Sequence, residues 1–482
     1  MANSFHRTPL NKGAVNLPGS TPQSVALLQE LLRKDYEGHH CFTADSGLHN
    51  HLTHHLMAVH DLGAPASLLQ VIYDEEVSMQ RPLRVADKIE VTELNWTLRL
   101  GKPDSYADYL DFFSTQISAC GITRVLQRYV FDPEANRGGA MMLVRLMSGL
   151  IHPFIQLGFG IEFGQDCMVA QGLAEAAVTA PGGIAAFEMP SALPALAECN
   201  PAKTTLLELL REVYDSPTLA PVMPYDPDAL MVKRLRDWMA DPTRAAEIRR
   251  IYDKWSIDLQ GGDEEFDRKV EECIFQATLL VAATGKPGRA PRHDFFLMHY
   301  LTSAIFLPTV LKKLPTPTAK AQLLQSYVRV AAVILMLRGR PRIDIPLIMS
   351  CSEFPQPPEQ GLNGGRADSS AFGKPDEAGG TNPWFAIVRN ALHHPEPHVA
   401  KSVRALYYGA QAFGHITRGG VLGAFDASGA ETHPGAGQLD GTVFLRAAGS
   451  ICQALGWVTH GQPASDWDRS ALGWEEAWVD GN

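Results

Sequence analysis

The sequence predicts an all-α protein, and three observations support that fold class. Apolar residues recur at intervals of three and four through most of the chain, which is the period of an amphipathic helix. Alternating strand patterns are scarce, and the best of them covers residues 88–100. We find no repeat with a period of about 20 to 50 residues, as a solenoid would have. One large helical domain over residues 1–482 is therefore expected.

The helices are expected in the following order. The first covers residues 24–36, where leucines form one stripe. The second begins after Asn50, a good N-terminal cap, and stops at Gly63. Further patterns with the same period cover residues 66–77, 202–214, 229–240, 243–255, 264–284 and 322–340.

The apolar segment 141–163 is long enough to cross a bilayer, which takes about 20 residues. Arg145, His152, Pro153 and Glu162 interrupt it, however. We therefore interpret it as a buried helix of a large core and predict no membrane span.

Two segments have the composition of loops. Residues 354–384 are rich in proline, glycine and serine and precede the helical pattern that contains His398, so they are expected to form a flexible loop or an active-site flap. Residues 419–442 are rich in glycine and are expected to form a surface loop.

The composition excludes some classes of protein. The net charge is −11 and no block of basic residues is present, which argues against a nucleic-acid-binding surface. The apolar fraction of 45% is sufficient for a large core. Seven scattered cysteines without a CxxC motif, and a start without an apolar signal segment, predict reduced thiols and a cytoplasmic location.

A nucleotide-binding loop is not predicted. The stretch GFGIEFG at 158–164 has the spacing G-x-G-x-x-x-G, which differs from the dinucleotide fingerprint, and it does not follow a credible strand. There is no Walker A motif either.

The positions of the histidines suggest a metal site. Seven of the 17 lie between residues 39 and 60, and His51 and His55 are one helical turn apart with His54 beside them. His152, His299 and His398 lie in or near apolar runs, where an unpaired imidazole is costly. Each can be a hydrogen-bonded core histidine, but several helices can also bring such residues to one buried metal ion.

Lys401 follows His398 by three residues, so both side chains lie on one face of a helix that begins near Pro397. A lysine is an unusual neighbour for a metal ligand, because an ammonium group has no lone pair. From this stretch alone, a solvated helix start is the simplest interpretation.

Four motifs, in this order, resemble those of the questin oxidase-like family: NHLTHHLMAVHDLGA, GLIHPFIQLGFGIEF, DFFLMHYLTSAIFLP and HVAKSVRAL. The resemblance extends from about residue 45 to residue 410 and covers most of the chain. Members of this family are fungal oxygenases of secondary metabolism, with bacterial relatives, that open the central ring of anthraquinones.

The resemblance implies a set of ligands. Relatives that act on anthraquinones are described as non-haem iron dioxygenases whose metal is held by four histidines and a lysine carboxylated on its side-chain nitrogen. Carried over motif by motif, the ligands of Fe(II) are expected to be His51, His152, His299, His398 and Lys401 as N-carboxylysine, with His54 and His55 as second candidates. A carbamate formed with carbon dioxide is an oxygen anion and can bind a metal. Gln156 stands where members often carry a histidine, so that position is not expected to be a required ligand.

The expected activity is O2-dependent cleavage of a C–C bond beside a carbonyl in an anthraquinone-type aromatic polyketide. Tyrosines next to the ligand motifs are candidates for binding this substrate, and phenylalanines are candidates for lining its pocket; as core residues all of them can equally be structural. These residues are Tyr300, Tyr407, Tyr408, Phe154, Phe159, Phe295 and Phe296.

Three alternatives remain open. An NADPH-dependent Baeyer–Villiger monooxygenase would use the same substrates but should carry a nucleotide-binding loop. A metal-dependent hydrolase with a lysine carbamate bridging two ions would need more Asp and Glu near the histidines than the sequence offers. A helical scaffold would not need the buried histidines.

Overall fold

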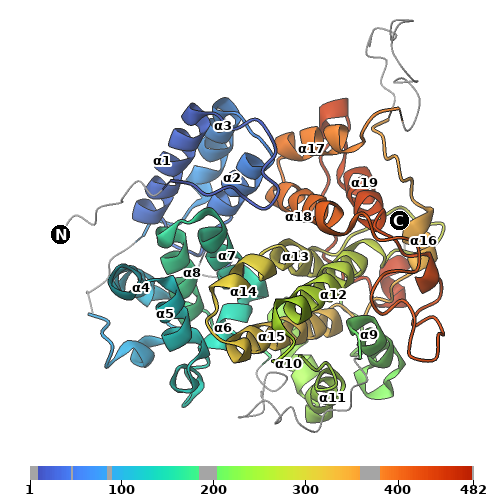
Figure 1. The fold of residues 1–482 in the computed structure, drawn as a ribbon, viewed down its shortest axis with the longest axis horizontal. Coiled ribbons are helices and arrows are strands. Elements are labelled where there is room, and N and C mark those ends of the chain that lie inside the picture. The colour runs from blue at the N-terminus through green and yellow to red at the C-terminus, as the bar shows by residue number, and fades with distance from the viewer. Residues whose placement is uncertain (1–8, 45–46, 84–89, 184–203, 359–379, 480–482) are drawn as a thin grey trace, which may run out of the picture. The chain divides into compact units, whose positions relative to one another are not determined.

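The computed structural model describes residues 9–44, 47–83, 90–183, 204–358 and 380–479. Across these residues the regular structure is helical, and β-pairing is confined to isolated bridges such as that between Phe42 and His49. Figure 1 shows this arrangement of helices. The all-α prediction is confirmed.

The chain divides into two compact units, each assembled from three segments. Unit 1 contains residues 1–203, 232–270 and 303–334, and unit 2 contains residues 204–231, 271–302 and 335–482. The organisation as one domain stays a prediction.

The helices of unit 1 include three that lie side by side near the N-terminus, α1, α2 and α3 (Figure 1). The helices wholly within this unit are α1 (Pro22–Gly38), α2 (Leu52–Asp61), α3 (Ala66–Glu76), α4 (Tyr106–Cys120), α5 (Ile122–Leu126), α6 (Met142–Met147), α7 (His152–Phe163), α8 (Asp166–Val178), α11 (Pro242–Tyr252) and α14 (Leu307–Lys313). Four helices contribute residues to both units: α10 (Met231–Met239), α12 (Gly262–Ala282), α13 (Phe295–Ala304) and α15 (Pro317–Leu337).

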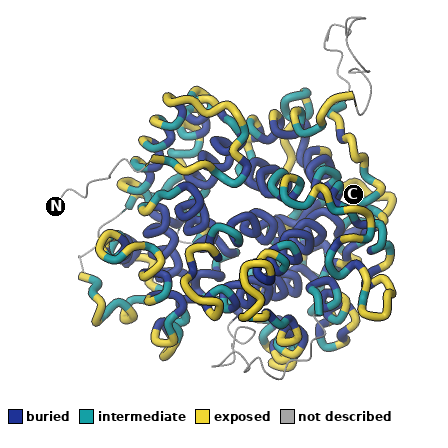
Figure 2. Tube along the Cα trace, in the orientation of Figure 1, coloured by how far each residue is buried: buried dark blue, intermediate teal, exposed yellow. Residues whose placement is uncertain are grey.

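Helix α7 forms the centre of unit 1 and is buried along its whole length (Figure 2). It packs closely against α8 because glycines face the neighbouring backbone. A Cβ on Gly160 would lie 2.5 Å from the nitrogen of Val169, and one on Gly172 would lie 2.6 Å from the nitrogen of Leu157. The glycines of GFGIEFG therefore lie within α7 and at its end, where they serve helix packing, and not in a turn between a strand and a helix.

The segment 141–163 is buried as predicted, but it is not one helix. Left-handed backbone at Gly149, Leu150 and Ile151, with φ of 57°, 54° and 66°, separates α6 from α7. Pro153 then occupies the first turn of α7, where its missing N–H costs no helical hydrogen bond. Periodicity missed this break because the apolar pattern continues through it.

In unit 2, helices α17, α18 and α19 pack against one another (Figure 1). The helices within this unit are α9 (Leu206–Asp215), α16 (Ile345–Ser350), α17 (Trp384–His393), α18 (Pro397–Phe413) and α19 (Val443–Leu455). Helix α18 begins as expected from its sequence: Glu396 caps it by accepting the backbone N–H of His398, and Pro397 follows.

The structure differs from two patterns of the sequence. In the segment 88–100, residues 90–100 form turns and a short 3₁₀-helix (Trp96–Arg99), not a strand. The alternation there leaves Leu94 98% exposed, and no partner strand is present among the described residues. The segment 419–442 is a loop, but not a purely superficial one, because Val421, Ala424 and His433 are buried in it. Most of the predicted flap, 359–379, lies outside the described residues.

Within the described residues, one helix, Pro317–Leu337, is long and apolar enough to cross a membrane, and the bent pair α13 and α14 passes the same test if taken as one span. Of the most apolar window in Pro317–Leu337, 89% is buried in the protein, which is typical of a core helix.

Candidate functional site

In unit 1 the structure brings together two predicted ligands, His51 and His152. His51 is the N-terminal cap residue of α2, and His152 is the first residue of α7. Their Nε2 atoms face each other at 2.8 Å, and their rings are nearly parallel, with centroids 4.9 Å apart. Two nitrogens bound to one ion at about 2.0–2.1 Å would lie at a similar separation, about 3 Å.

The break before α7 determines how His152 is held. Its Nδ1–H donates to the carbonyl oxygen of Gly149 at 2.6 Å, which leaves the lone pair of the neutral ring on Nε2. Left-handed backbone at a non-glycine residue costs about 1–3 kcal/mol, and Leu150 and Ile151 both adopt it. The strained backbone therefore lies directly beside a candidate metal ligand.

A third histidine of unit 1, His49, supports this pair, and the sequence did not single it out. Its ring stacks on His152 with centroids 4.0 Å apart and planes 4° from parallel. Its Nδ1 is paired with Glu175 of α8, a buried carboxylate. A Cβ on Gly149 would lie 2.8 Å from Nε2 of His49, so glycine is needed there both for φ and for space.

In unit 2 the structure brings together the other two predicted histidines, His299 of α13 and His398 of α18. Their ring centroids are 5.0 Å apart and both residues are buried. Phe295 lies against both rings, at 5.0 Å from His299 and 5.1 Å from His398. The Nδ1–H of His299 donates to the carbonyl oxygen of Phe295 at 2.9 Å, one turn earlier in the helix.

Glu396 holds His398 in the same way. One oxygen of its carboxylate accepts the Nδ1–H of His398 at 2.5 Å, and the other accepts the indole N–H of Trp467, also at 2.5 Å. Burial raises the pKa of Glu396 above its usual value, while the hydrogen bond from Trp467 and the charge of Lys401 oppose that rise. The sequence analysis missed Glu396 and Trp467, although the position of Glu396 two residues before His398 was a usable signal.

Lys401 lies one turn after His398 on α18 and is buried, at 3% exposure. The interpretation of this stretch as a solvated helix start is therefore wrong. A lysine kept out of water loses stabilisation of its ammonium form, which favours the free amine.

Three of the four predicted histidine ligands have a bonded Nδ1, which fits a metal ion on the other ring nitrogen. Metal-bound histidines nearly always donate their second ring nitrogen to a carbonyl or a carboxylate, and His152, His299 and His398 each do so. His293 provides a contrast, because its Nδ1 and Nε2 are both bonded inside the core, to Val281 and Ser450. Whether the two pairs together form one site, as the motifs predict, stays a prediction.

The remaining predicted residues have mixed surroundings. His54 lies with its centroid 6.2 Å from that of His51 and stacks on Phe159, whereas His55 is bonded through Nδ1 to Glu76 of α3 at 2.5 Å. Gln156 hydrogen bonds to Thr53 and Gln171 inside unit 1. Its amide is therefore engaged in the core.

The three candidate tyrosines are buried or half-buried. Tyr300 is fully buried and donates to Gln276 at 3.1 Å. Tyr407 is half-buried with its ring 4.8 Å from that of Trp384, and Tyr408 is half-buried as well. Of the phenylalanines, Phe295 touches candidate ligands, Phe296 lies beneath Arg338, and Phe154 packs on Tyr327. A substrate role for any of them stays a prediction.

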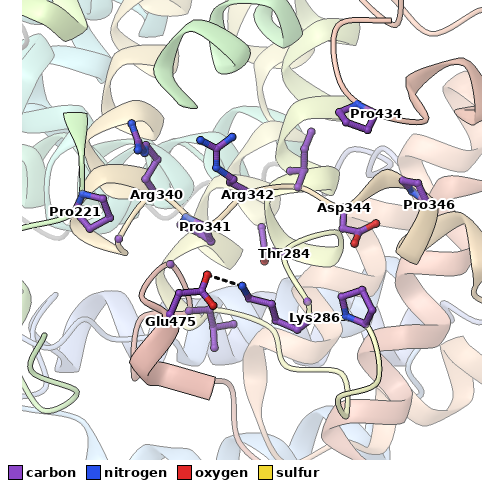
Figure 3. A pocket seen from close by; sticks show the side chains of 16 residues that line it. Pro221, Thr284, Lys286, Arg340, Pro341, Arg342, Asp344, Pro346, Pro434 and Glu475 are labelled. Carbon is purple, nitrogen blue, oxygen red and sulfur yellow. Dashed lines mark hydrogen bonds and ion pairs between the residues drawn. The ribbon is translucent and has the colours of Figure 1, made fainter. Parts of the chain in front are cut away.

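The larger of the described pockets, about 620 Å³, lies in unit 2 and is lined by residues of other elements (Figure 3). Its charged groups are engaged: Lys286 pairs with Glu475, and Arg340 and Arg342 donate to carbonyl oxygens at the end of α9. Asp344 caps α16. None of the predicted ligands lines this pocket.

The fold and the two histidine pairs define a helical protein with candidate metal ligands. The chain matches the family model described as Questin oxidase-like over residues 48–406, and it belongs to that family. The resemblance seen in the four motifs is thereby confirmed.

Curated relatives align along nearly the whole chain. A questin oxidase of Aspergillus terreus is 26% identical over 99% of this chain and 97% of its own. The Baeyer-Villiger oxidase AgnL3 of Paecilomyces divaricatus is 27% identical over 98% and 94%. The Baeyer-Villiger oxidase ptaJ of Pestalotiopsis fici is 28% identical over 84% and 85%. These names support an oxidoreductase.

Proposed function

We propose that this protein is a non-haem iron-dependent oxygenase that opens a ring of an anthraquinone-type aromatic polyketide in secondary metabolism. Fe(II) would be held by His51, His152, His299, His398 and Lys401 as N-carboxylysine. The observation that carries the proposal is that three of these histidines have Nδ1 bonded to a carbonyl or carboxylate, the arrangement of metal ligands. Family membership supports the substrate class.

When bound, iron would supply the activation of O2. The chain's own groups hold the imidazoles in one tautomer: Gly149 for His152, Phe295 for His299 and Glu396 for His398. Burial of Lys401 favours the amine that carbon dioxide can modify. With the substrate in its reduced phenolic form, one O2 adds both of its atoms across the cleaved C–C bond, so no further reductant enters the balance.

The proposal is tested by metal content and turnover. Purified protein should contain about one iron per chain, since four histidines and one carbamate oxygen suit a mononuclear centre. Chelation should abolish O2 consumption on reduced anthraquinones, and anaerobic Fe(II) should restore it. Full activity in iron-free protein would falsify the proposal; two zinc ions per chain with hydrolytic activity would indicate the hydrolase instead.

The names of the relatives favour a second candidate, a Baeyer–Villiger monooxygenase on the same class of substrate. In that reaction one oxygen atom enters the product and NADPH reduces the other to water. Labelling with oxygen-18 gas separates the two candidates, because the dioxygenase incorporates two labelled atoms and the monooxygenase one. A strict requirement for NADPH with a substrate that is already reduced would favour the monooxygenase.

A further inference from the structure

A short segment near the C-terminus, Trp467–Arg469, contacts the beginnings of both histidine-bearing helices of unit 2. We refer to it as the C-terminal strap. It lies outside the part of the chain that the family model matches, which ends at residue 406. It also contains no histidine, and nothing in its sequence indicates a role in the site.

The strap reaches α18 through the side chain of Trp467, which is buried. Its indole N–H, the one hydrogen-bond donor of that side chain, is directed to the carboxylate of Glu396 at 2.5 Å. The same carboxylate accepts both the ring Nδ1–H and the backbone N–H of His398. Trp467 therefore positions the carboxylate of Glu396, and this carboxylate orients the ring of His398.

The strap reaches α13 mainly through its backbone. The N–H of Asp468 donates to the carbonyl oxygen of His293 at 2.9 Å, and the carbonyl of Asp468 accepts the N–H of Phe295 at 2.8 Å. The side chain of Asp468 also pairs with Arg292. These bonds hold the first residue of α13, whose carbonyl accepts the Nδ1–H of His299.

Arg469 adds a contact on the ring of Phe295, with its guanidinium carbon 3.7 Å from the ring centroid. Phe295 in turn lies against both His299 and His398. Three successive residues of the strap thus act on the immediate partners of the two imidazoles.

We propose that the C-terminal strap is a positioning element of the metal centre, which orients His398 through Glu396 and His299 through Phe295. The inference rests on the proposed function, because it assumes that these imidazoles bind a metal. Loss of a hydrogen-bonding partner behind a metal-bound histidine typically weakens metal binding about 10- to 100-fold.

The test uses the full-length protein and Co(II) as a spectroscopic probe for the metal. Trp467→Phe should weaken Co(II) binding about 10- to 100-fold in chelator competition and change the visible absorption of bound Co(II). Trp457→Phe is a matched control, since Trp457 is an equally buried indole of unit 2 whose N–H has no hydrogen-bond partner among the described residues. It should leave affinity and spectrum unchanged.

A double variant tests whether Trp467 acts through Glu396. Glu396→Gln alone should also weaken binding, and Trp467→Phe combined with Glu396→Gln should lose little more than the stronger single variant, because the two residues share one path. Thermal unfolding of the metal-free proteins shows whether Trp467→Phe still folds. Its midpoint should lie below that of Trp457→Phe, because it alone loses a hydrogen bond to a buried carboxylate, but both variants should be fully folded at the temperature of the binding assay.

Two negative results differ in meaning. If the wild type binds Co(II) and Trp467→Phe binds it with the same affinity and spectrum as Trp457→Phe, the strap only packs against the helices and the inference is wrong. If the wild type binds neither Co(II) nor Fe(II), the proposed function itself is wrong, and the strap has no metal centre to position.

Discussion

At the scale of single residues, three of the candidate ligands share a partner for the ring nitrogen Nδ1, a feature that they have in common with His39, His49 and His55. Many buried histidines in this protein are ordinary core residues: His394 bonds to the carbonyl of Leu455, and His433 to that of Leu207. These two bond through Nε2. His152, His299 and His398 bond through Nδ1, so their lone pair is on the more distant nitrogen, which is suited to reach a metal.

This bonding, taken together with the family match over residues 48–406, leads to a prediction for histidine variants. His152→Ala should lower metal affinity by at least about 10-fold and abolish turnover, because a ligand nitrogen is lost. His39→Ala is the control: it removes an imidazole whose Nδ1 is also bonded, to Asp35 of α1, but which lies outside residues 48–406 that the family model matches. It should retain metal and activity. Wild-type iron content in His152→Ala would contradict the assignment of unit 1.

Lys401 leads to a second prediction at this scale. A protonated lysine one turn from a metal-bound His398 would repel Fe(II), whereas a carbamate would bind it. Lys401→Arg and Lys401→Ala should therefore lose iron and activity to a similar degree, because arginine stays charged and cannot be carboxylated. Lys401→Glu is expected to regain part of the iron binding.

The measurement is iron content with turnover, together with the intact mass under carbon dioxide or electron density at Lys401. Full activity of Lys401→Arg, or an unmodified lysine in the active protein, would rule out the carbamate.

At the scale of elements, α7 and α8 support the stacked rings of His152 and His49. His152 starts α7, while Glu175, which pairs with His49, belongs to α8. The two helices can approach this closely because Gly160 and Gly172 lack a Cβ at the contact. An error in this packing would shift His49 relative to His152, since the two stacked rings depend on different helices.

The predicted consequence is that Gly160→Ala lowers the free energy of unfolding by about 1–3 kcal/mol, the usual cost of overpacking, because its Cβ would meet backbone that cannot yield easily. Gly38→Ala at the end of α1 is the control, since nothing lies within 4 Å of the added Cβ. Denaturant unfolding of both variants measures the difference. Equal stability of the two would show that α7 and α8 separate without cost.

At the scale of the whole molecule, the proposal draws one pair of ligands from each unit. A ligand that binds only the folded state raises the free energy of unfolding by about 2.7 kcal/mol when its concentration is 100 times the dissociation constant. If all four histidines hold one ion, that stabilisation requires both pairs. Removal of a ligand histidine from either unit would then abolish the whole stabilisation.

We therefore expect Co(II) to raise the thermal midpoint of the wild type, and both His51→Ala and His398→Ala to abolish that rise. His433→Gln serves as a control for the removal of a buried imidazole distant in sequence from the motifs. Two independent sites would give another pattern: each alanine variant would keep about half of the bound metal and part of the rise in midpoint.

The helical fold class and the family of this protein could be predicted from its sequence alone. Helix period predicted the α-helices because their apolar stripes depend on local spacing, and ordered motifs revealed the family because its residues keep their neighbours along the chain. Contacts between distant residues were decided by tertiary structure. Nothing local announces the left-handed break before His152, the stacking of His49 on His152, or the hydrogen bond from Trp467 to Glu396 across 71 residues. These contacts depend on which helix ends meet, and only packing of the folded chain brings those ends together.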